Sequence, residues 1–159
     1  MFLFSKVYDI AMYTNDFHFL YEPNECRTLK DVVKFMGSTL LLVIMTISPR
    51  KIVYYSSTDP DEKSKYGFFK RLHEKLLRPS DLILRVPLVC SNDSTLLKSL
   101  KNGTFKGDKD IRLDYITVDD FRDYFTRSVN KCGVVDYDGD RYNDSIARIE
   151  ELFESTKWI

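Results

Sequence analysis

Two groups of aspartates have residue types and spacing that suit metal-ion chemistry. One follows the apolar run Gly133-Val134-Val135 and reads Asp136-Tyr137-Asp138-Gly139-Asp140. The other lies in Phe105-Lys106-Gly107-Asp108-Lys109-Asp110, and Asp9 follows an apolar run near the start of the chain. Carboxylates gathered at one place repel each other, and a hard divalent cation such as Mg²⁺ or Mn²⁺ removes that repulsion. Such an ion can activate water and stabilise the charge that develops on a cleaved phosphodiester.

These aspartates can meet only if the fold brings their strands to one edge of a sheet. The pattern predicts strands at Ile52–Ser56, Leu82–Cys90 and Gly133–Val135, with Pro87 placing part of the second at an edge or bulge. Helices are predicted between them, over 60–78 and after Thr117. This alternation favours a three-layer α/β fold of PIN or Rossmann-like type, with a mainly parallel sheet flanked by helices, in one domain over 1–159. Sites in such folds form at the carboxyl ends of the strands.

Other segments are predicted from shorter signals. Phe2–Tyr8 and Phe17–Tyr21 are predicted strands, and Thr28 is predicted to cap a short helix that Gly37 ends. The continuous apolar run Leu40–Ile47 predicts a strand covered on both faces. Two choices stay open: the segment 111–116 forms a strand or begins a helix, and the last helix begins at Asp140 or Asn143.

From Lys51 to Leu152, the order of these features resembles the NYN domain of the PIN-like nuclease superfamily, LabA-like branch. That family has a strand of Tyr-Tyr character, a helix and a further strand, then a Lys-Gly-x-Asp segment and a strand that ends in Asp-x-Asp. Here the corresponding segments are Ile52-Val53-Tyr54-Tyr55, the helix over 60–78, Leu82 to Val89, Lys106 to Asp110, and Val134 to Asp140.

The resemblance implies a metal-dependent ribonuclease that acts on single-stranded RNA. It implies a catalytic role for Asp110, Asp138 and Asp140, and these three with Asp9 would hold Mg²⁺ or Mn²⁺. Lys106 would approach a phosphate of the substrate, and Asp114 or Asp119 would be a further acidic residue. The basic residues on the 60–78 helix could track an RNA backbone, or they form an ordinary exposed helix face.

The chain departs from the family pattern at three places. Tyr8-Asp9-Ile10 stands where the family has Asp-Gly-x-Asn, Asp136-Tyr137 replaces Ser-Gly, and the region Asn15 to Met45 has no counterpart. A degenerate member that keeps the fold without the activity is therefore a second form of this hypothesis. The run Asp136 to Asp140 is also what a plain turn with a helix N-cap requires.

A different class of function is a non-enzymatic α/β interaction module, such as an adaptor, an inhibitor or a subunit of a larger complex. The chain has 159 residues, with 24 Lys and Arg against 24 Asp and Glu, so its net charge is +0. Aromatic residues make up 14% of the chain, which suits protein contacts. Neutral charge also excludes a global field that would draw the chain to nucleic acid or anionic lipid.

The remaining features limit which cofactor and which cellular compartment we expect. The sequence has no G-x-G-x-x-G and no Walker A motif, so a nucleotide cofactor is not indicated. It has no signal peptide and no apolar run long enough for a bilayer, and its three cysteines are widely spaced, so a cytoplasmic protein is expected. His73 lies among charged helix residues and is predicted to be on the surface.

Overall fold

The computed structural model describes residues 16–20, 28–58, 65–92 and 94–155, without the side chains of residues 65 and 66. A parallel sheet contains four strands in the order β1 (Phe17–Phe19), β2 (Ile52–Ser57), β3 (Leu82–Val86) and β6 (Gly133–Asp136). A smaller sheet contains β4 (Leu88–Cys90), β5 (Arg112–Thr117) and β7 (Tyr142–Ser145). In it, β5 pairs parallel with β4 and antiparallel with β7.

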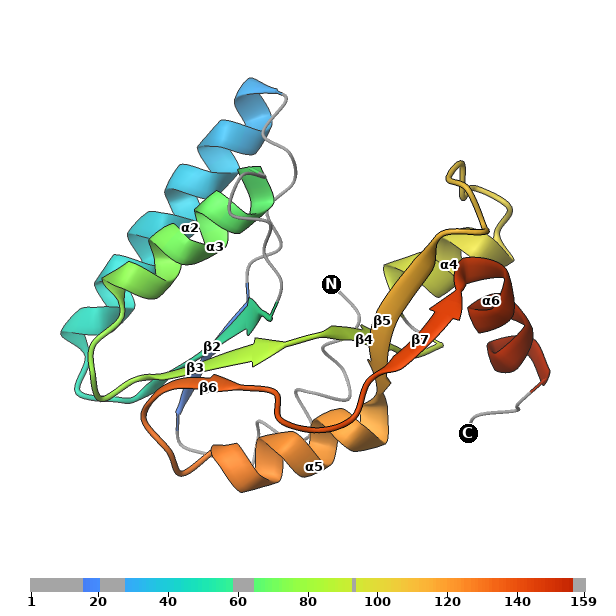
Figure 1. The fold of residues 1–159 in the computed structure, drawn as a ribbon. Coiled ribbons are helices and arrows are strands. Elements are labelled where there is room, and N and C mark those ends of the chain that lie inside the picture. Colours follow the sequence, from blue (N-terminus) through green and yellow to red (C-terminus); the bar gives the residue numbers. More distant parts are fainter. Residues whose placement is uncertain (1–15, 21–27, 59–64, 93, 156–159) are drawn as a thin grey trace.

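Helices cover both faces of the parallel sheet. Helices α2 (Leu29–Ile47) and α3 (Lys65–Leu76) lie on one side of it, and α5 (Val118–Ser128) lies on the other (Figure 1). Helices α4 (Thr95–Lys101) and α6 (Ile146–Ser155) lie beside the small sheet (Figure 1). The predicted fold class, a mainly parallel sheet flanked by helices, is therefore confirmed.

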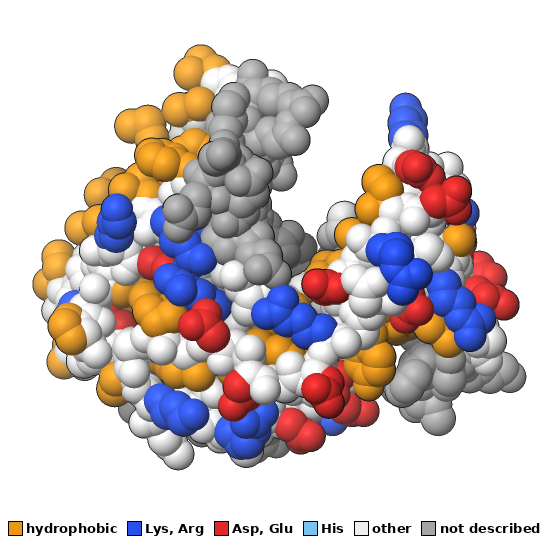
Figure 2. Space-filling view, viewed as in Figure 1, with side chains coloured by type: hydrophobic (Ala, Val, Ile, Leu, Met, Phe, Trp, Pro, Cys, Tyr) orange, Lys and Arg blue, Asp and Glu red, His pale blue; other side chains and the backbone are white. Residues whose placement is uncertain are grey.

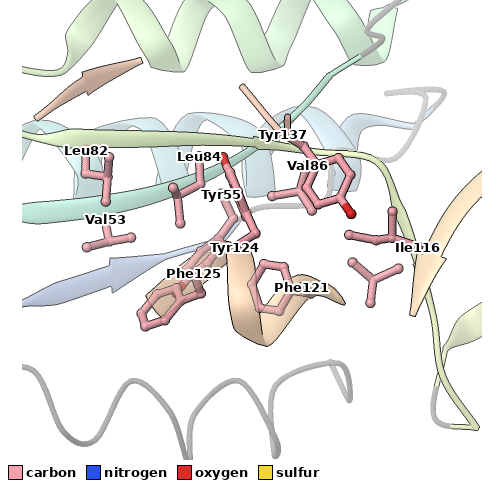
Figure 3. Close-up of a cluster of buried hydrophobic side chains, with 11 residues drawn as sticks. Val53, Tyr55, Leu82, Leu84, Val86, Ile116, Phe121, Tyr124, Phe125 and Tyr137 are labelled. Atoms are coloured by element: carbon pink, nitrogen blue, oxygen red, sulfur yellow. The ribbon is translucent and has the colours of Figure 1, made fainter. Parts of the chain in front are cut away.

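Side-chain alternation along β2 divides the core of the parallel sheet. Val53 and Tyr55 face α5, where they join Phe121, Tyr124 and Phe125 (Figure 3). On the opposite face of the sheet, the core is formed by Phe19, Leu42, Ile52, Tyr54 and Ile83. A third cluster packs the small sheet against α4 and α6.

The apolar run at Leu40–Ile47 is the clearest difference from the predicted elements. It forms the second half of α2, so the predicted strand is wrong and Gly37 does not end the helix. The predicted cap is confirmed, because the Thr28 side chain accepts a hydrogen bond from Asp31 N–H while Asp31 accepts one from Thr28 N–H. A short apolar run has no period that separates a strand from a helix, and this one follows an established helical start.

Other predicted boundaries are refined. The segment at 111–116 is strand β5, and residues 142–145 form β7 before α6 begins at Ile146. The predicted strand over 82–90 divides at Pro87 into β3 and β4, which belong to different sheets. The predicted strand over 2–8 lies outside the described residues, and no helix within the described part of the chain has the length and apolar character to cross a membrane.

Candidate functional site

Among the aspartates predicted to share a metal ion, the three that the structure describes, Asp110, Asp138 and Asp140, do not form a metal site. Both carboxylate oxygens of Asp138 lie 3.2 Å from Nη1 of Arg127, and Asp140 is exposed nearby. Asp110 and Lys106 lie exposed in the loop before β5, and Asp9 lies outside the described residues. Across the described ranges, no three His, Cys, Asp or Glu side chains are grouped so that they could hold a metal ion. The predicted Mg²⁺ or Mn²⁺ cofactor is therefore wrong.

The further acidic candidates are engaged in local contacts. Asp119 forms an ion pair with Arg122 one helical turn away on α5. Asp114 accepts a hydrogen bond from the Asn143 side-chain amide across β5 and β7. Both contacts fix local structure and leave neither carboxylate beside Asp110 or Asp138.

The polar residues that do converge lie on the inward face of α3. Lys70, His73 and Glu74 are 1%, 0% and 9% exposed, whereas Phe68 on the same helix is 57% exposed. The predicted surface position of His73 is therefore wrong. Lys70 was predicted to belong to an exposed basic face of this helix, and that prediction is wrong too, because Lys70 is buried. Buried polar groups need partners, and the neighbouring strand supplies them.

Lys70 and His73 are held by groups of β2 and α2. The Lys70 ammonium donates to the Tyr55 carbonyl over 3.0 Å and lies 5.4 Å from the centre of the Tyr54 ring. His73 lies between two hydroxyls, with Nδ1 3.2 Å from Tyr54 Oη and Nε2 2.8 Å from Thr39 Oγ1. Burial, with the nearby charge of Lys70, lowers the pKa of His73 to about 4, so this imidazole is neutral at pH 7.

Glu74 connects α3 to the carboxyl end of β2 and to β3. It accepts hydrogen bonds from Ser56 Oγ over 2.5 Å and from Arg85 Nη2 over 2.7 Å, and it also pairs with Arg71. Burial alone would raise the pKa of Glu74, but the hydrogen bonds from Arg85 and Ser56 outweigh burial and leave the pKa below its usual value. Glu74 is therefore a charged anchor and not a proton donor at neutral pH.

A pocket of about 350 Å³ opens where the two sheets meet, beyond the ends of β2 and β3. It is lined by Ser57, Thr58, Pro87, Leu88, Arg112, Leu113, Asp114 and Asn143. Figure 2 shows the surface hollowed beside the part of the molecule that carries β5 and β7. The pocket combines hydroxyls, a guanidinium, a carboxylate and an amide, which are groups that bind polar small molecules.

Thr58 is the pocket residue with an unmet hydrogen-bonding requirement. Its Oγ1 is buried and has no hydrogen-bond partner among the described residues. Arg112, which also lines the pocket, is oriented by Asn143, whose side-chain oxygen accepts from Arg112 Nε over 2.6 Å. A ligand that brings a phosphate oxygen into the pocket would meet an oriented cation.

Sequence reasoning missed this site, although one local signal points to it. Ser56-Ser57-Thr58 places three hydroxyls in succession at the carboxyl end of β2, where α/β folds form their sites.

No family model matches the chain, and no curated protein matches it. Solved structures do share its fold. The capsular polysaccharide assembling protein CapF from Staphylococcus aureus has a TM-score of 0.59 at 16% identity, over 95% of this chain and 48% of that one. A hypothetical dTDP-4-dehydrorhamnose reductase from Sulfolobus tokodaii has a TM-score of 0.58 at 16% identity, over 95% and 64%.

The Bordetella bronchiseptica enzyme WbmG in complex with NAD has a TM-score of 0.56 at 15% identity, over 96% of this chain and 59% of that one. The chain has a Rossmann-like α/β fold. It spans between 48% and 64% of the length of these three structures. The predicted membership of the PIN/NYN superfamily is therefore wrong, and so are the ribonuclease function and RNA binding that followed from it.

The described residues do not fit NAD, which the WbmG structure holds. In doubly wound sheets a dinucleotide binds where the strand order reverses, against a glycine-rich turn. The order β1-β2-β3-β6 runs in one direction through the described sheet, so that sheet contains no reversal. None of the 159 residues belongs to a G-x-G-x-x-G motif.

Proposed function

We propose that this chain binds a nucleotide-sugar type of ligand in the pocket between its two sheets. The observation that carries the proposal is the guanidinium of Arg112, which lines the pocket and is oriented by Asn143. A pyrophosphate would accept hydrogen bonds from this guanidinium, and Asp114 and Asn143 could bind sugar hydroxyls.

The fold comparisons support this ligand class. One similar structure is described as a hypothetical dTDP-4-dehydrorhamnose reductase, and WbmG was also solved with NAD and UDP together. That second WbmG structure has a TM-score of 0.57 at 15% identity to this chain. Since the described residues offer no dinucleotide site, the role proposed for this chain is ligand binding. Glu74 holds Ser56 and Arg85 in place at the adjacent strand ends.

Isothermal titration calorimetry with UDP and dTDP tests the pocket. Uridine, which has no phosphate, is the comparison ligand. Arg112→Ala is expected to weaken UDP binding at least tenfold, because it removes a charged hydrogen bond worth about 1.5–3 kcal/mol. Arg122→Ala, an exposed arginine on α5, is the matched control and should bind as wild type does. Equal affinities for UDP in the Arg112 variant and wild type would overturn the proposed pocket.

Thr58→Val tests the buried hydroxyl. Valine has nearly the shape of threonine and removes the hydroxyl that has no partner among the described residues, so the melting temperature should rise slightly. A melting temperature below that of wild type would contradict this reasoning.

We also propose that the protein is cytoplasmic. Cys90 and Cys132 are both free thiols, as is usual in a reducing compartment.

A further inference from the structure

Asn143 lies beside two opposite charges on the wall of the pocket that strands β5 and β7 form. Asp114 is directly opposite Asn143 in the register of these strands, and Arg112 precedes Asp114 by two residues. Directly paired residues, and residues two apart along a strand, point to the same face of a sheet. The three side chains therefore share one face, and all three line the pocket.

The side-chain amide of Asn143 bonds both charged groups at once. Its oxygen accepts a hydrogen bond from Arg112 Nε over 2.6 Å, and its nitrogen donates one to Asp114 Oδ1 over 2.5 Å. The backbone carbonyl of Asn143 accepts a further hydrogen bond from Arg112 Nη2. A guanidinium only donates and a carboxylate only accepts, so these partners fix which way the amide is turned.

Arg112 and Asp114 do not pair with each other. Side chains two residues apart on one strand face are neighbours, so an ion pair between them would be an ordinary contact. Instead, every hydrogen bond that these two side chains make to the described residues goes to Asn143. Within the described part of the chain, Nη1 of Arg112 and Oδ2 of Asp114 are therefore left for a ligand.

A direct ion pair would remove both of these groups from the pocket. The guanidinium would give its donors to the carboxylate, and each charge would neutralise the other. Because the Asn143 amide occupies the inner donor of Arg112 and one oxygen of Asp114, the two charges stay separate. The pocket wall then offers a cation and an anion side by side.

We propose that Asn143 is a positioning residue of the pocket, which holds Arg112 and Asp114 apart for the ligand. The inference rests on the proposed function, because the pocket is where these charges act. The arrangement selects a ligand that carries an anionic oxygen near a hydroxyl. The anionic oxygen accepts from the guanidinium, and the hydroxyl donates to the carboxylate.

Calorimetric titration with UDP in two backgrounds tests the separation of charges. With Asp114 present, Asn143→Ala is expected to weaken UDP binding about tenfold, because Arg112 then pairs with Asp114. In an Asp114→Asn background the same change should cost less than about threefold, since no carboxylate is left to neutralise Arg112. Asn102→Ala, at an exposed asparagine after α4, is the matched control and should bind as wild type does. An equal cost in the two backgrounds would overturn the proposal.

Proton–nitrogen NMR of the protein without ligand tests the positioning independently of UDP. The Arg112 Nε–H signal, assigned by its loss in Arg112→Ala, should be protected from exchange with water in wild type. In Asn143→Ala it should shift but persist, because Asp114 becomes the acceptor. In the variant that combines Asn143→Ala with Asp114→Asn it should be lost to exchange. A signal that Asn143→Ala leaves unchanged, or removes by itself, would overturn the role of Asn143.

The two measurements separate this inference from the proposed function. Wild-type protein that fails to bind UDP, with NMR signals as expected, would overturn the proposed function and support the separation of Arg112 from Asp114 by Asn143. Protein that binds UDP, with signals contrary to expectation, would overturn the role of Asn143 alone.

Discussion

Protonation of His73 is predicted to destabilise the fold at mildly acidic pH. The imidazole is fully buried, lies face to face with Phe35 at 5.2 Å between ring centres, and contacts the hydroxyls of Tyr54 and Thr39. Its pKa is lowered from 6.5 to about 4, first by burial and then by the charge of Lys70. The folded state therefore favours the neutral ring, and the unfolded state does not.

The sign and size of the effect follow from proton linkage. Between pH 6.5 and pH 4 the unfolded chain binds a proton at His73 that the folded chain excludes, so stability falls as the pH falls through this window. Each unit of pKa difference corresponds to about 1.4 kcal/mol. From pH 7 to pH 5, His73 alone should therefore reduce the free energy of unfolding by about 2 kcal/mol.

Urea unfolding followed by circular dichroism at pH 7, 6 and 5 measures this loss. His73→Gln should be less stable than wild type at pH 7, but its stability should vary much less with pH. His18 acts in the same direction, because burial lowers its pKa against the opposing charge of Asp16. The comparison is therefore made in a His18→Gln background. An unchanged pH dependence after His73→Gln would refute the assignment of the titration to this residue.

Two further predictions concern the contact between the loop before β3 and the start of β6, where Gly133 N–H donates to the Asp81 carbonyl over 2.7 Å. Asp81→Asn is expected to reduce the free energy of unfolding by about 3 kcal/mol in urea titrations, because Asp81 is 1% exposed and accepts hydrogen bonds from Ile52 N–H and from the Arg78 guanidinium. An effect no larger than that of Asp119→Asn, on exposed α5, would contradict it. Gly133→Ala should lower stability by about 1 kcal/mol, since Gly133 has φ of +79°. In thermal melts, a Gly133→Ala protein as stable as wild type would contradict that reasoning.

Much of the fold follows from local signals in the sequence. The strands at 52–57, 82–86 and 133–136 are apolar and bounded by turn residues, and Thr28 and Thr117 are each followed three residues later by a carboxylate that completes a capping box. These signals are local, so they are visible in the sequence. The choice between strand and helix at 111–116 depends on pairing with β4 and β7, which is not local.

The site could not be predicted in the same way, because α3 inverts the usual amphipathic pattern. The pattern of Phe68, Leu72 and Leu76 predicts an inward apolar face, yet Phe68 is exposed and Lys70 and His73 are buried. Hydropathy cannot anticipate that the Tyr55 carbonyl and two hydroxyls satisfy these polar groups. The density of carboxylates in the aspartate clusters suggested a metal site. In the fold, Asp138 pairs with Arg127 and Asp136 pairs with Arg85.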